Sequence, residues 1–423
     1  MSPRSPASRW RVFAGALALG VLIAAGITLQ RRGDTPAMEP DTSSPQPARN
    51  PGPHPQAAAK PRSVDTGKSV NSGAAERCAE IFQSATELSI RERKAAYPLE
   101  GRDADEFAPS YADLEALQRN LLASAQPEYV LAGHLLIRPE SPASVTAPPD
   151  KSPWRELTRH AIASRSPLLA WHALRECVTS QQPCLSESQE QSLLDIDRQN
   201  SESWALVAIL RHRRGDESGA LTAMQGAASS PTSTYYWTET LGLIEQALAS
   251  HSPMSYRDRV LSVFGVGAAM AIPPLANISR ICRKGAATTR DWGEACYTLG
   301  VLQGMKNETE IARMFSYNLR EQTLQAMGDV DGAAAVLEER AKATFDMGSS
   351  DLKTSMWTMQ SALIESDPAR FQAYLAAVRG SGEEAGVRAF LHQQIPLLLE
   401  RAGIPAQEET RSCLTDLLVP PEA

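Results

Sequence analysis

Six cysteines are the residues whose spacing most clearly indicates chemistry. Four of them form two local pairs, Cys177 with Cys184 and Cys282 with Cys296, and each pair flanks a break between two predicted helices. Antiparallel helices joined by a short turn bring such residues within disulfide distance. Because disulfides persist in oxidising compartments, these pairs predict an exported domain.

Other interpretations of the cysteines lead to different chemistry. Buried free thiols fit the same positions, whereas a zinc site requires C-x-x-C spacing or clustered histidines. The sequence has no C-x-x-C, and its histidines are scattered. Cys78 and Cys413 lie near the two ends of the predicted domain, and nothing in the local sequence decides whether they pair.

The sequence contains no complete catalytic motif, only short partial matches of the kind that arise by chance. The chain has no H-E-x-x-H, no G-x-S-x-G and no complete Gly-rich phosphate loop. The string 66–69 resembles the end of a phosphate loop, but Arg62 occupies the position of the leading glycine. Ser350 and Lys353 fit S-x-x-K without the companion motifs of that enzyme class. We therefore predict no catalytic, metal-binding or cofactor-binding residue.

Two polar or aromatic clusters are candidates for a partner surface. A basic cluster at 211–214 ends one predicted helix, where it could bind an acidic group or simply complement the helix dipole. An aromatic cluster at 235–237 starts the next predicted helix, and such residues serve either as interface anchors or as core. The candidate surface comprises Arg211, Arg213, Arg214, Tyr235, Tyr236 and Trp237.

A membrane anchor is predicted at the start of the chain. Val12 to Gln30 is an uncharged run of 19 residues flanked by arginines on both sides. As a helix it would be about 28 Å long, close to the thickness of the hydrocarbon core of a bilayer. This run is longer than the apolar core of an ordinary cleaved signal peptide. A cleaved signal peptide is the alternative interpretation. Residues 1–11 are then a cytoplasmic tail and the cysteine-bearing domain is periplasmic.

Composition defines the rest of the chain. Residues 31–73 are rich in proline and nearly free of large apolar residues, which predicts a disordered linker. The net charge of −7 argues against a general nucleic-acid binder. Abundant Ala and Leu with few aromatic and β-branched residues predict an all-α domain.

The apolar periodicity predicts a series of paired helices with short breaks, typical of a helical hairpin array. Prolines between 139 and 153 separate an N-terminal helical region, 74–138, from a repeat domain, 153–423. Helices are predicted over 76–95, 110–125, 128–137, 154–165, 167–178, 186–198, 202–214, 217–229, 233–250, 255–270, 273–283, 291–304, 308–327, 330–345, 351–365, 368–378, 383–401 and 408–418.

Residues 194–231 resemble a tetratricopeptide repeat (TPR), and one period later Leu241 and Gly242 fall on its Leu-Gly site. A weaker echo is the Gly-Asp pair at 328–329, followed by Ala333 and Leu337. The departure is Arg211, at a position that is usually aromatic. Ala205 and Ile209 stand where carboxylate-clamping TPRs carry Lys and Asn, so the resemblance does not imply that clamp. The matching packing positions are Trp204, Val207, Ala208, Gly215, Ala220, Met224 and Ala227.

The resemblance implies an α-solenoid that binds other proteins. The layout is also similar to uncharacterised envelope proteins of Gram-negative bacteria. We therefore expect a single-pass inner-membrane protein whose periplasmic TPR-like domain acts as an adaptor, assembly factor or chaperone for an unidentified envelope protein. The alternatives are a helical glycan-cleaving enzyme, with two acids on facing helices, and an oligomerising structural spacer. Nucleic acid is not an expected partner.

Overall fold

Helices form every regular element that the structure describes, and eighteen of them follow one another along the chain. The structure is a computed structural model, and it describes residues 72–96, 111–136, 153–180, 184–270, 274–345, 350–405 and 408–418. The predicted all-α class is therefore confirmed for these residues. The chain divides into two units, residues 1–75 and residues 76–423, and the second unit holds nearly all of the described residues.

The helices occupy the segments that the apolar periodicity predicts. Their ends differ from the predicted ends by no more than four residues. The helices are α2 (Ser72–Ala96), α3 (Tyr111–Leu122), α4 (Pro127–Leu136), α5 (Pro153–Ser164), α6 (Pro167–Thr179), α7 (Glu187–Ile196), α8 (Ser201–Arg213), α9 (Glu217–Ala228), α10 (Trp237–His251), α11 (Tyr256–Ala269), α12 (Leu275–Ala286), α13 (Arg290–Lys306), α14 (Glu310–Met327), α15 (Val330–Phe345), α16 (Ser350–Ser366), α17 (Pro368–Ser381), α18 (Glu383–Arg401) and α19 (Glu408–Leu418).

Local sequence explains the turn of the TPR-like hairpin formed by α8 and α9. The side chain of Asn200 accepts a hydrogen bond from the backbone amide of Glu202 and so caps the start of α8. Gly215 follows α8 with a φ of +80°, a conformation that glycine adopts without strain. Asp216 then caps α9 by accepting from the amide of Gly219. Residues within the hairpin itself therefore determine where α8 begins and ends and where α9 begins.

Close packing between the two helices depends on a glycine and a tryptophan. A Cβ atom at Gly226 of α9 would lie 2.6 Å from the ring of Trp204 on α8. The same pairing recurs between α12 and α13, where a Cβ atom at Gly285 would lie 2.5 Å from the ring of Trp292. The TPR-like positions Val207, Ala208, Ala220, Met224 and Ala227 are all buried. These contacts describe a tightly packed hairpin, while membership in a repeat family stays a prediction.

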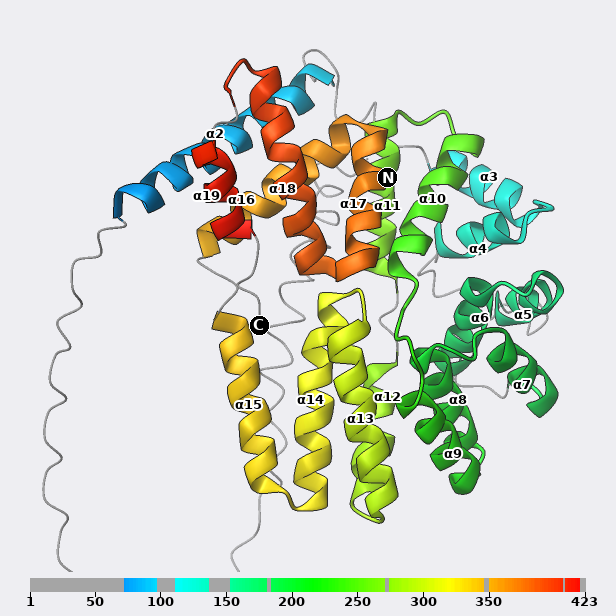
Figure 1. Cartoon of the computed structure of the whole chain (residues 1–423). Coiled ribbons are helices and arrows are strands. Elements are labelled where there is room, and N and C mark those ends of the chain that lie inside the picture. Colours follow the sequence, from blue (N-terminus) through cyan, green and yellow to red (C-terminus); the bar gives the residue numbers. More distant parts are fainter. Residues whose placement is uncertain are drawn as a thin grey trace, which may run out of the picture. The chain divides into compact units, whose positions relative to one another are not determined.

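Hairpins pack against one another in a continuous series (Figure 1). The α8–α9 hairpin contacts α12 and α13, α13 pairs with α14, and α14 pairs with α15. A second set is built around α10, which contacts α4, α11 and α17, and it extends to α16, α18 and α19. α4 also contacts α5 and α6, so the two regions predicted on either side of residues 139–153 share contacts in one compact unit.

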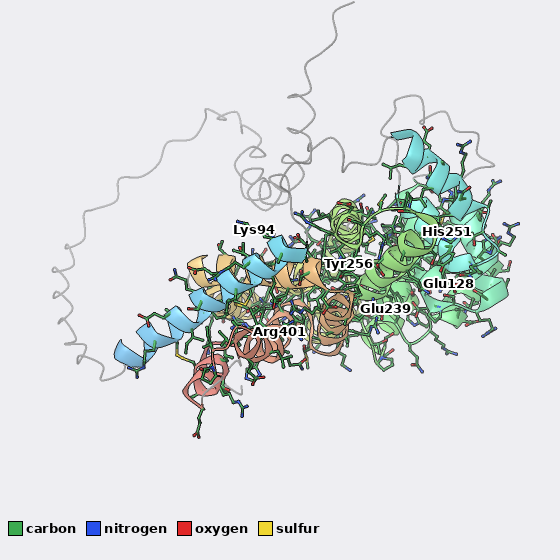
Figure 2. All side chains as sticks on the ribbon, turned by 90° about the horizontal axis from the view of Figure 1, so that it is seen from above. Lys94, Glu128, Glu239, His251, Tyr256 and Arg401 are labelled. Atoms are coloured by element: carbon green, nitrogen blue, oxygen red, sulfur yellow. A yellow bond between two sulfur atoms is a disulfide. The ribbon has the colours of Figure 1, made fainter. Side chains whose placement is uncertain are left out.

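Three disulfides connect the cysteines. Cys177–Cys184 and Cys282–Cys296 have Cα–Cα distances of 5.6 and 5.7 Å, which confirms the two predicted local pairs. The third bond joins Cys78 of α2 to Cys413 of α19, with a Cα–Cα distance of 5.3 Å across a separation of 335 residues. The pairing that the sequence left open therefore ties the first described helix to the last one (Figure 2).

A shared carboxylate gives α2 a further attachment. Arg93 of α2 and Arg257 of α11 both pair with Glu365 of α16, at 3.6 and 3.2 Å. Lys94 and Tyr256, labelled in Figure 2, are the sequence neighbours of these two arginines. α2 is thus held by a covalent bond near its start and by an ion pair near its end.

The predicted anchor, Val12 to Gln30, lies outside the described residues, as does nearly all of the predicted linker at 31–73. No helix in the described part of the chain is long and apolar enough to cross a membrane.

Candidate functional site

An extended linker between α9 and α10 is the least expected part of the fold. The sequence predicts that a helix begins at residue 233, but α10 begins at Trp237, so that predicted boundary is wrong. The start of α8 holds the linker instead, because the Asn200 side chain bonds both the amide and the carbonyl of Thr234, each at 3.0 Å. The amide of Ser201 donates to the carbonyl of Thr232 at 2.9 Å. Tyr236 ends the linker with a φ of +53°, in the left-handed region.

Three buried carboxylates surround this linker, and we call Asp197, Glu202 and Glu308 the acidic junction. They come from the end of α7, the first turn of α8 and the turn between α13 and α14. Each is less than one-tenth exposed. Three separate parts of the chain therefore place an acid against the same extended segment.

Asp197 binds the end of the linker. Its carboxylate accepts hydrogen bonds from the hydroxyls of Ser203 and Tyr236 and, at 3.0 Å, from the Nδ2 of Asn200. Burial raises the pKa of Asp197 from 3.8 to about 6, even though these three hydrogen bonds lower it. The phenol of Tyr236 and the carboxyl of Asp197 together fix the residue that precedes α10.

Glu202 is the most deeply enclosed of the three, with 2% of its surface exposed. The hydroxyl of Ser233 donates to its Oε1 at 2.6 Å, and the Nε2 of Gln303 lies 3.0 and 3.1 Å from its two oxygens. Asn307 donates to the hydroxyl of Ser233 at 3.3 Å and so joins the same network. Burial raises the pKa of Glu202 from 4.5 to about 7, because its neutral donors only partly compensate for lost hydration.

Glu308 caps α10 from a position 70 residues along the chain. It accepts from the hydroxyl of Thr238 at 2.6 Å, from the amide of Thr238 at 3.4 Å and from the amide of Trp237. These amides are ones that the first turn of a helix leaves unpaired, and Tyr236 offers them no side-chain cap. Burial raises the pKa of Glu308 above its ordinary range, the Thr238 bond opposes that rise, and the charge of Glu239 adds to it.

The predicted basic cluster makes its contacts within the protein. Arg211 and Arg214 both bind Glu190 of α7, at 2.8 and 2.7 Å. Arg213 donates to the carbonyl of Val178 at the end of α6, at 2.6 Å. These contacts attach the end of α8 to α6 and α7, an attachment that neither interpretation of the cluster included.

The predicted aromatic cluster lies in the junction. Tyr235 is 5% exposed and its ring centroid is 6.1 Å from that of Trp171, so it does not face solvent as a partner surface requires. Tyr236 and Trp237 are partly buried. Their contacts with Asp197 and Glu308 place both residues beside the acids.

Sequence reasoning did not identify Glu202 or Glu308 as site residues. An acid in the first turn of a helix, as Glu202 is, normally indicates only a favourable interaction with the helix dipole. Glu308 precedes Thr309, which caps α14, so its local sequence explains a helix start and nothing more. The link between these acids and residues 230–238 exists only in the folded chain.

An exposed apolar edge is the second candidate feature. Five of the ten large apolar side chains exposed in the described part of the chain belong to α13, α14 and α15: Met305, Ile311, Met327, Val330 and Leu337. Val330, Ala334, Leu337 and Ala341 of α15 are exposed at spacings of four, three and four, which places them on one face of that helix. We call these four residues the α15 stripe.

The side of α15 that packs lies about 100° around the helix axis from the stripe. Ala333 and Val336 are buried, and α14 is the principal neighbour of α15. Figure 1 shows α13, α14 and α15 as successive members of one row. The α15 stripe is therefore the unpacked face at the end of this row.

No protein-family model, curated protein or solved structure matches this chain.

Proposed function

We propose that this chain is an exported, membrane-anchored helical scaffold that binds another envelope protein through α15. The observation that carries this proposal is the α15 stripe, where Val330 is 71% and Leu337 is 43% exposed. A contiguous apolar surface on a water-facing helix costs free energy unless a partner covers it. Burial of these side chains on binding is the expected driving force.

Three disulfides support the proposed compartment. All six cysteines are paired in the structure. Such bonds are rare in reducing cytosol and common in exported domains. Together with the apolar run at Val12–Gln30, they favour a domain held outside the cytoplasm by an N-terminal anchor.

The chemistry of α15 indicates the kind of partner. Glu338 and Lys342 are exposed beside the stripe, and Glu339 is engaged by Arg320 at 2.6 Å. An apolar row with charged margins suits an amphipathic helix that presents anchors at matching spacings. Helical arrays commonly use such extended faces for binding without chemistry of their own.

Site-specific crosslinking in cells tests the proposal. A photo-crosslinking residue at Leu337 or Ala334 of the full chain should give the same protein adduct from both positions, identified by mass spectrometry. Ala335 is the matched control, because it is exposed on the same helix but lies about 100° around the axis from Ala334 and about 160° from Leu337. The control position should give much less of that adduct.

A second variant distinguishes docking from proximity. Leu337→Asp should remove the adduct formed from Ala334 while leaving the far-UV circular dichroism spectrum and the melting temperature unchanged. The proposal fails if the stripe positions give no protein adduct, or if Ala335 gives the same adduct as strongly. An adduct with a second copy of this chain would instead support an oligomeric spacer.

A further inference from the structure

The acidic junction connects two sets of helices through one linker. Asp197 and Glu202 belong to the set that contains α8, and Glu308 belongs to the turn that opens α14, while the linker leads into α10. We propose that this junction is a pH-sensitive joint, which is tight when its carboxyls are protonated and loosens when they ionise. The inference is independent of whether α15 binds a partner.

Neutral donors are the basis of this behaviour. Each hydrogen bond to the three carboxylates comes from a hydroxyl, an amide side chain or a backbone amide. The contrast is Glu190, equally buried but bound by Arg211 and Arg214. A buried acid with a cationic partner stays ionised, whereas one with only neutral donors favours the protonated form.

The surroundings of Glu202 also contain acceptors for the added proton. A protonated carboxyl donates one hydrogen bond and needs a nearby acceptor. The Oε1 of Gln303 and the hydroxyl of Tyr235 are buried without a hydrogen-bond partner in the structure. Rotating the Gln303 amide by half a turn exchanges its oxygen with the nitrogen that lies 3.0 Å from Glu202. The protonated carboxyl of Glu202 therefore has a side-chain acceptor within reach.

The other charged groups around the junction bond partners other than its three carboxyls. Lys306 donates to the carbonyl of Pro231 at 2.8 Å, and Glu239, labelled in Figure 2, pairs with Arg379 at 2.8 Å. Glu383 accepts from the amide of Glu310. Burial raises the pKa of the Tyr374 phenol, and the charges of Glu383 and Glu308 add to this rise.

On the α6 side, the ring of His172 bonds the hydroxyl of Thr240 at 3.1 Å. Burial lowers its pKa well below 6.5, and the charge of Arg175 adds to this effect, so this ring stays neutral. In the described part of the chain, no three His, Cys, Asp or Glu side chains are placed to hold a metal ion. Protons are thus the ligand that the three carboxyls suit.

The direction of the effect follows from the raised pKa values. Glu202 has a pKa of about 7 in the closed joint and 4.5 when it is solvated, and Asp197 has about 6 against 3.8. The closed joint binds protons more tightly than the open one, so its stabilisation is complete below the solvated values. It is lost progressively as the pH rises toward 7. Acid therefore closes the joint, and neutral to alkaline pH loosens it.

Hydrogen exchange of the full chain, read by mass spectrometry at pH 5.5 and pH 8.0 and corrected for intrinsic rates, tests the inference. The probe is peptides covering residues 229–240. For an opening that solvates Glu202, the opening constant should be about thirtyfold larger at pH 8.0 than at pH 5.5. In Glu202→Gln the side chain stays neutral, so this difference should shrink strongly and protection at pH 8.0 should rise.

Controls separate the junction from general effects of charge. Glu365→Gln changes a buried acid that pairs with Arg93 and Arg257, and it should leave the pH response of residues 229–240 intact. Equal protection of wild-type residues 229–240 at both pH values would overturn the inference, as would a full pH response in Glu202→Gln. If Glu202→Gln does not reach the wild-type circular dichroism spectrum, Asp197→Asn provides the same test, with the loss of response centred near pH 6.

Discussion

Replacing Glu202 by glutamine should make this protein more stable at pH 8 and leave it nearly unchanged at pH 4.5. Glutamine keeps the size of the side chain and one acceptor for Ser233, but it carries no charge to desolvate. Because the wild-type carboxyl is protonated at low pH and ionised at high pH, the advantage of glutamine must appear only as the pH rises.

The size of the effect follows from the displacement of the pKa. Moving the pKa of Glu202 from 4.5 to about 7 corresponds to about 3 kcal/mol of stability lost by the wild type between these values. Glutamine recovers this amount less the weaker hydrogen bond that a neutral oxygen accepts, so a net gain of roughly 1–3 kcal/mol at pH 8 is expected. The gain should fall toward zero as the pH approaches 4.5.

Urea unfolding of the full chain and the variant at half-unit steps from pH 4.5 to pH 8.5 measures this gain, with fluorescence and circular dichroism as independent probes. The unfolding midpoints should converge at the acid end and separate above pH 6. A constant difference at all pH values would refute the reasoning, because it would mean that packing and not ionisation distinguishes the two side chains. A less stable variant at pH 8 would show that the carboxylate is better satisfied than its neutral donors indicate.

Three further substitutions test how the fold is held together. Gly226→Ala should destabilise the protein by about 1–3 kcal/mol, because its Cβ atom would meet a tryptophan ring at 2.6 Å; Gly265→Ala, where nothing lies within 4 Å, should be neutral or stabilising in the same thermal melt. Changing Cys78 and Cys413 together to serine should cost roughly 3–5 kcal/mol and increase hydrogen exchange in α2, and an unchanged exchange rate would show that non-covalent contacts are sufficient to hold that helix. Glu190→Gln should cost about 2 kcal/mol in urea unfolding by leaving two partly buried arginines with a neutral partner, and a cost near zero would mean that solvent compensates for them.

The parts of the fold that the sequence predicts are those decided over short distances. Apolar spacing of three and four residues identifies each helix, and Cys177 and Cys184 lie close together because one turn joins their segments. The bond between Cys78 and Cys413 depends on 335 residues of intervening packing, so no local pattern contains it. The prediction that residues 233–236 are helical is wrong for a related reason. The side chain of Asn200, 34 residues away, bonds the amide and carbonyl of Thr234 that would otherwise pair within a helix.

The acidic junction could not be predicted from the sequence because its partners are also far apart along the chain. Glu308 and Thr238 are 70 residues apart, and Glu202 and Gln303 are 101 apart, so only tertiary packing makes them partners. The aromatic cluster marked the correct region, although its residues pack into the junction instead of facing solvent. Buried acids are hard to predict because their unusual property, a raised pKa, results from enclosure and not from residue type.

The two proposals meet in α14. This helix begins two residues after Glu308 and ends three residues before Val330, the first residue of the α15 stripe. A turn that is loosened at Glu308 releases one end of α14, and a packed helix transmits displacement along its length more readily than it absorbs it. If both proposals hold, binding at α15 should be tighter at pH 5.5 than at pH 8 in the wild type and independent of pH in this range when the junction is made neutral. If Leu337→Asp abolishes binding at α15 but leaves the pH response of residues 229–240 intact, the partner surface and the joint are distinct parts of the molecule.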